Sequence, residues 1–132
     1  MSISDPISDF LTIIRNGCKA RFKYVDIPAS QIKQKITKTL VNQGYIDRFI
    51  NIKDDKQGLL RVFLKYDANG EPIINTIRRI SKPGCRRYVN AKNLPRVKNN
   101  LGIAILTTPK GIMTAREAEQ KNTGGEVLCE IW

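Results

Sequence analysis

The residues from Thr107 to Thr114, TTPKGIMT, place two adjacent hydroxyls, a proline, a lysine and a glycine between an apolar run and a polar run. Such groups can bind a nucleotide phosphate, supply a nucleophile, or present hydrogen-bonding groups to a partner. The stretch does not match a Walker phosphate loop, because Lys110 precedes Gly111 and the earlier glycine is missing. A nucleophilic Thr107 or Thr108 would need a base, and the chain has no histidine. We therefore expect no enzyme.

Presentation of polar groups to a partner is the remaining interpretation. Neighbouring hydroxyls can bind base edges, ribose or phosphate, and RNA sequence is usually read at irregular, unstacked sites. Gly124 and Gly125 would allow two backbones to approach closely, which would place Glu126 beside the hydroxyls. Since phosphate repels a carboxylate, Glu126 fits there only if it accepts from a base amino group or braces a donor. Otherwise it is an ordinary charge on an edge strand.

The charge of the chain favours a polyanionic partner. It has 23 Lys and Arg against 12 Asp and Glu, a formal net charge of +11. Residues 72–116 contain ten basic residues and no acidic one. A folded segment with charges of one sign is typical of a nucleic-acid-binding surface. General solubility would explain the net charge alone, but it does not explain this distribution.

Composition limits the class of protein further. Hydrophobic residues make up 41% of the 132 residues, enough for a packed core in one domain or two small ones. No apolar run approaches the roughly 20 residues that span a membrane. The N-terminus lacks the basic start of a signal peptide, so we expect a cytoplasmic protein without a membrane partner. Cys18, Cys85 and Cys129 are widely spaced, which favours reduced thiols; neither a metal nor a cofactor is expected.

The first half of the chain predicts the order α-β-α-β-β. Asp5 and Pro6 can begin a helix, and apolar residues then recur at helical spacing as far as Ile14. Ser30 can cap a second helix, which Gly44 would end. The expected strands are 24–27, 45–52 and 59–66.

The second half predicts a β-rich domain with one short helix. Residues 67–72, DANGEP, have the composition of a turn. The expected strands are 73–80, 85–90, 101–108 and 126–132. Thr114 and Glu117 form a capping box that would begin a helix over 115–121. The fold class is therefore α+β, with an N-terminal domain at 1–66, a linker at 67–73 and a C-terminal domain at 74–132.

Longer motifs resemble a known family. The segments GIAILTTPKGIMTAREAEQKNTGGEVLCEIW, RRISKPGCRRYV, DPISDFLTIIRN and IPAS are similar to the bacterial small-subunit ribosomal protein eight family over nearly the whole chain. The resemblance implies a structural constituent of the small ribosomal subunit that binds a central-domain helix of 16S rRNA directly and helps to assemble the platform. The family usually has Ser-Thr-Ser where this chain has Thr107, Thr108 and Pro109, so one hydroxyl and one backbone N–H are lost.

Matching positions and chemistry together give the expected RNA-binding residues. We expect arginine and lysine to contact phosphates, and Thr107, Thr108, Glu126 and Tyr88 to recognise exposed bases. The full set is Thr107, Thr108, Lys110, Gly111, Glu126, Gly124, Gly125, Tyr88, Arg86, Arg87, Thr12, Arg15, Asn16 and Lys33.

The resemblance also implies partners other than 16S rRNA. These are the small-subunit ribosomal proteins five and twelve, with the chain itself a monomer within the ribosome. The alternative function is a stand-alone translational repressor that binds its own mRNA with the same surface. A nuclease would require metal-dependent turnover of bound RNA.

Overall fold

The computed structural model describes residues 5–98 and 101–132; the first four residues of the predicted N-terminal domain lie outside them. The chain forms two compact units. One contains Asp9–Asn75, and the other contains Thr76–Trp132 together with the described residues before Asp9. Helices and antiparallel sheets occur together, which confirms the α+β class. The predicted domain limits, with a linker at 67–73, stay a prediction.

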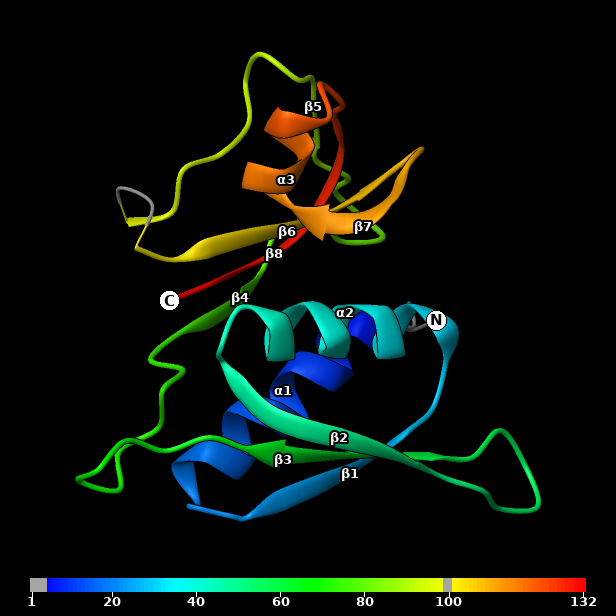
Figure 1. Cartoon of the computed structure of the whole chain (residues 1–132). Helices are drawn as coiled ribbons and strands as arrows, with labels where there is room; N and C mark the ends of the chain where they lie inside the picture. Colours follow the sequence, from blue (N-terminus) through cyan, green and yellow to red (C-terminus); the bar gives the residue numbers. More distant parts are fainter. Residues whose placement is uncertain (1–4, 99–100) are drawn as a thin grey trace. The chain divides into compact units, whose positions relative to one another are not determined.

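The first unit places two helices against one face of a three-stranded antiparallel sheet (Figure 1). The strands lie in the order β1-β3-β2. The elements are α1 (Pro6–Lys19), β1 (Tyr24–Pro28), α2 (Gln31–Asn42), β2 (Ile46–Ile52) and β3 (Leu59–Leu64). The predicted order α-β-α-β-β is confirmed.

Local signals explain these elements. The carboxylate of Asp5 accepts the N–H of Ser8 at 3.2 Å, which caps the start of α1. Ser30 caps α2 in the same way through the N–H of Lys33. In β3 every second residue is buried, as expected for a strand with one face against the helices. The core therefore lies between the helices and this face.

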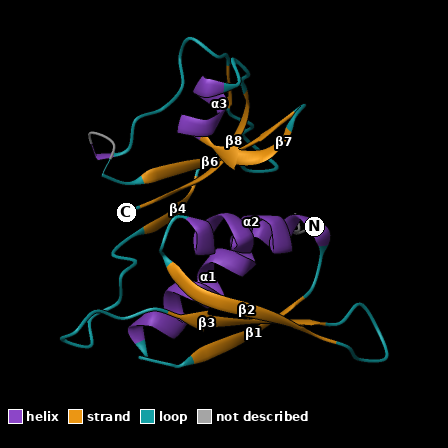
Figure 2. Cartoon of the chain, in the orientation of Figure 1, coloured by secondary structure: helices purple, strands orange, loops and turns teal. Residues whose placement is uncertain are grey.

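The second unit is built around a five-stranded antiparallel sheet. Its strands lie in the order β4-β8-β6-β7, and β5 pairs with β8 off this path. Figure 2 shows these strands and the short helix of the same unit. The elements are β4 (Ile77–Arg79), β5 (Tyr88–Val89), β6 (Ile103–Thr108), β7 (Gly111–Thr114), α3 (Ala115–Gln120) and β8 (Gly125–Ile131). Since β8 pairs with three strands, it positions residues from all of them.

The short helix α3 begins at the predicted capping box. The hydroxyl of Thr114 accepts the N–H of Glu117 at 3.2 Å, and the carboxylate of Glu117 accepts the N–H of Thr114. Ala118 of α3 is fully buried, in a cluster with Leu106 of β6 and Val127 of β8. This packing holds α3 against one face of the sheet.

Several predicted strand bounds in this unit were wrong. The strands expected over 73–80 and 85–90 contain only Ile77–Arg79 and Tyr88–Val89, because turns occupy the flanking residues. Strand β7 was missed, since its four residues begin at a glycine two positions after a proline and were interpreted as an irregular corner.

Candidate nucleic-acid interface

The stretch TTPKGIMT is the tip of the β6–β7 hairpin. Thr108 and Gly111 are cross-strand partners, so only Pro109 and Lys110 lie in the turn. The hydroxyl of Thr108 donates to the carbonyl of Gly111 at 2.8 Å and accepts the N–H of Lys110 at 3.1 Å. Gly111 has a φ of +116°, a conformation that favours glycine. The Thr108 hydroxyl thus stabilises the turn.

Three of the predicted RNA-binding residues form a row across the sheet. The register pairs Tyr88 with Glu126, and Glu126 with Thr107. Residues directly opposite each other in antiparallel strands share a face, so the three side chains are neighbours. Tyr88 is 69% exposed. The hydroxyl of Thr107, unlike that of Thr108, has no hydrogen-bond partner among the residues that the structure describes. We call these three residues the Tyr88 row.

Two glycines bring this row together. A Cβ on Gly125 would lie 2.1 Å from the carbonyl oxygen of Thr107, and a Cβ on Gly124 would lie 2.3 Å from that of Val89. Both distances are far below van der Waals contact, so only glycine permits these approaches. The expected close approach at the two glycines is present, and it is sufficient reason for glycine at both positions. A direct contact of either with RNA stays a prediction.

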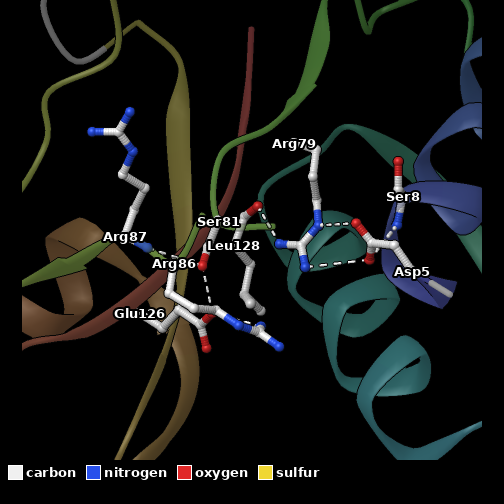
Figure 3. Close-up of polar contacts among 8 residues, drawn as sticks. All are labelled: Asp5, Ser8, Arg79, Ser81, Arg86, Arg87, Glu126 and Leu128. Carbon is white, nitrogen blue, oxygen red and sulfur yellow. Dashed lines mark hydrogen bonds and ion pairs between the residues drawn. The ribbon is translucent and has the colours of Figure 1, made fainter. Parts of the chain in front are cut away.

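The carboxylate of Glu126 is held by two donors on one oxygen (Figure 3). The hydroxyl of Ser81 and the guanidinium of Arg86 both donate to Oε2, the latter at 2.9 Å. Burial raises the pKa of Glu126, but these hydrogen bonds and the charges of Arg86 and Arg79 outweigh it. The net effect is a pKa below the ordinary value, so the carboxylate is charged at neutral pH.

The adjacent arginines differ in what they bind. Arg86 forms the ion pair with Glu126, and its side chain is 48% exposed. Arg87 is exposed, and its guanidinium has no partner within the described part of the chain. Figure 3 shows its side chain extending away from the Ser81–Glu126 contact. The guanidinium of Arg87 is therefore the more available of the two for a further partner, whereas that of Arg86 is already engaged with Glu126.

Lys110 connects the hairpin tip to α3. Its Nζ donates to the carbonyl of Lys121 at 2.9 Å, at the C-terminal cap of that helix. A cation at this end also interacts favourably with the helix dipole. Lys110 is exposed, so this contact leaves part of its ammonium open to solvent.

The predicted residues of the first unit fall into two groups. Thr12 and Asn16 are exposed, one turn apart on α1, while Arg15 is half-buried and has contacts of its own. Lys33 is 9% exposed, and its Nζ donates to the carbonyl of Pro28 at 3.1 Å. The contact joins the end of β1 to α2, which gives Lys33 a structural role whether or not it also meets RNA.

Sequence reasoning missed Ser81. It is fully buried, and its hydroxyl links the N–H of Arg87 to the carboxylate of Glu126. The residue stands in RRISKPG, where a serine before Lys-Pro-Gly is as typical of a turn as of a polar network. No spacing pattern relates positions 81 and 126, because the sheet pairing alone brings them together.

Within the described ranges, 5–98 and 101–132, no group of three or more Cys, Asp or Glu could hold a metal ion. In the same ranges no helix has the length and apolar character to cross a membrane. The groups that the second unit brings together are the ring of Tyr88, the carboxylate of Glu126 and the hydroxyl of Thr107, with the guanidinium groups of Arg86 and Arg87 nearby. They make up the candidate binding site of a basic α+β protein.

Comparison with known proteins agrees with this class. The family described as Ribosomal protein S8 matches residues 5–132. The chain is 54% identical to the small ribosomal subunit protein uS8 of Syntrophobacter fumaroxidans. It is 50% identical to that of Streptococcus pneumoniae serotype 19F and 46% identical to that of Acidobacterium capsulatum. Each comparison covers all of both chains.

The chain therefore belongs to the ribosomal protein S8 family. It is a structural protein of the small ribosomal subunit and not an enzyme, and its location is the ribosome in the cytoplasm.

Proposed function

We propose that this protein binds 16S rRNA directly, at an irregular helix of the central domain, as a primary binding protein that helps to assemble the platform. The observation that carries the proposal is the Tyr88 row, in which a 69% exposed ring, an oriented carboxylate and a free hydroxyl share one sheet face. These are the groups that stack on unpaired bases and hydrogen-bond to their edges.

In this proposal, different residues of the site provide affinity for RNA in general and selectivity for the cognate RNA. Arg87 and the open part of Lys110 supply phosphate contacts, which hold the RNA irrespective of its sequence. The Tyr88 row supplies selectivity. Stacking on an aromatic ring contributes about 1–3 kcal/mol per base, so Tyr88→Ala should weaken the complex roughly 5- to 150-fold.

Thr12, Arg15 and Asn16 form a second RNA contact in this proposal, on the exposed side of α1. The partners are 16S rRNA and, from the family resemblance, the small-subunit proteins five and twelve. The protein acts as a monomer within the ribosome.

Footprinting on naked 16S rRNA tests the proposal. The expected result is protection of one irregular helix, reduced by Tyr88→Ala and unchanged by Lys56→Ala, which removes an exposed lysine from the β2–β3 turn of the other unit. Diffuse protection along the rRNA would show a generic basic protein instead. Strong binding to the protein's own mRNA without co-sedimentation with small subunits at high salt would favour a stand-alone repressor.

A further inference from the structure

Ser81 occupies a buried position in contact with Glu126 of the Tyr88 row. Its side chain is 0% exposed, and its hydroxyl oxygen accepts the N–H of Arg87 at 3.1 Å. The same hydroxyl donates to Oε2 of Glu126. A serine hydroxyl has one proton. Because the N–H of Arg87 can only donate and the carboxylate of Glu126 can only accept, that proton points toward Glu126.

The two oxygens of the Glu126 carboxylate are consequently different. Ser81 and Arg86 both donate to Oε2, while Oε1 receives no hydrogen bond from any residue in the described ranges. No buried side-chain oxygen of those residues lacks a partner, so Oε1 must reach the surface. The carboxylate thus presents one open acceptor next to Tyr88 and Thr107.

We infer that Ser81 is a positioning residue for RNA recognition, which turns the Glu126 carboxylate so that Oε1 accepts a hydrogen bond from a donor group on an unpaired base. The inference rests on the proposed function. The donor is an amino or imino group, since a carboxylate rejects carbonyl oxygens.

Arg86 is a weaker candidate for this role. Its side chain is 48% exposed, and an RNA phosphate can draw the guanidinium away from Glu126. Ser81 has no such alternative, because its contacts are enclosed by the protein. The orientation of Glu126 in the complex therefore depends on Ser81.

A double-mutant cycle in the full chain tests the inference. The variants are Ser81→Ala, Glu126→Gln and the pair together. Each is measured by its Kd for a transcript of the 16S rRNA central domain and for a generic RNA duplex. Ser81→Ala should lower the preference for the transcript about tenfold and leave duplex binding unchanged, as expected for losing a hydrogen bond to a charged group. In the Glu126→Gln background the same change should have no further effect.

Ala118→Gly is the matched control. It removes a buried methyl group of α3 that packs in the cluster with Leu106 and Val127. The change therefore destabilises the same unit without touching Glu126. Its melting temperature should fall while its preference for the transcript stays that of the wild type. If Ser81→Ala does not fold, Ser81→Cys keeps a weak donor of similar size and should give a smaller loss of preference.

Three results would overturn the inference. Additive losses in the cycle would show that Ser81 acts independently of Glu126. A loss of preference in Ala118→Gly as large as in Ser81→Ala would show an effect of stability alone, and a wild-type preference in Ser81→Cys would show that the hydroxyl is dispensable. If the wild-type protein itself does not prefer the transcript, the proposed function fails first and the role of Ser81 fails with it.

Discussion

Replacing Gly125 by alanine should separate β8 from β6 at the Tyr88 row. The added Cβ would lie 2.1 Å from the carbonyl oxygen of Thr107 and 3.0 Å from the Cα of Thr108. Because an ordinary carbon–oxygen contact is about 3.3 Å, the two backbones must move apart by roughly 1.2 Å. Neither neighbour is a flexible side-chain end, so the strand pairing itself has to yield.

The cost follows from this displacement. Overpacking costs about 1–3 kcal/mol, and each weakened ladder hydrogen bond costs roughly another 1 kcal/mol. We expect Gly125→Ala to lower the free energy of unfolding of this unit by about 2–4 kcal/mol. It should also reduce the preference for 16S rRNA, because the hydroxyl of Thr107 moves relative to Glu126.

Urea denaturation followed by tryptophan fluorescence measures the change. Trp132 is the single tryptophan of the chain and packs against the core of the same unit, so its emission reports this unit. Gly84→Ala is the control, since a Cβ there meets nothing within 4 Å. It should shift the unfolding free energy by less than about 0.5 kcal/mol. Equal midpoints for the two variants would refute the steric argument.

Five further substitutions separate the roles of individual side chains. Arg87→Ala should flatten the salt dependence of log K by about one unit without altering the preference for the rRNA, as a salt titration would show. Burial raises the pKa of Glu126, but its hydrogen bonds and the nearby arginines outweigh this effect and leave the pKa below the ordinary value. The contribution of Glu126 to the preference for the rRNA should therefore persist at neutral pH and be lost as the pH falls through the lowered pKa. Binding measured against pH should show no such loss in Glu126→Gln. Thr107→Val should lose selectivity at constant melting temperature, whereas Thr108→Val should lower both, measured by binding and thermal melts. Lys33→Met should reduce stability by roughly 1 kcal/mol in urea with an unchanged salt slope; a slope reduced by one would indicate a phosphate contact instead.

The parts of the fold that sequence predicted well depend on local signals. The caps at Ser30 and Thr114 satisfy free N–H groups within three residues, so they can be identified without tertiary information. The position of Gly44 just after α2, with a φ of +82°, is local in the same sense. The α+β order of the first unit follows from these signals and from side-chain periodicity.

Sheet pairing is the part that could not be predicted. Strand alternation alone would place Glu126 and Glu130 on one face of β8, because they are four residues apart. A register shift in β8 places Glu126 opposite Thr107 and Glu130 opposite Ala104, which are three residues apart in β6 and therefore on opposite faces. This register shift is a β-bulge that depends on the pairing of β8 with β6, and the pairing of two distant strands cannot be predicted from one sequence.

The contrast between the two threonines changes the interpretation of Pro109. A hairpin tip without a proline needs another constraint to fix its backbone, whereas here the ring presets φ and Thr108 closes the turn with its hydroxyl. A serine at position 109 would add a donor at the tip and also more freedom of the turn. Proline lacks that donor but restricts the backbone of the residue before it. The hydroxyl of Thr107 is therefore held in place by the hairpin while it makes no hydrogen bond within the described residues. Selectivity at this tip should therefore depend on Thr107 and its sheet neighbour Glu126 more than on the turn residues.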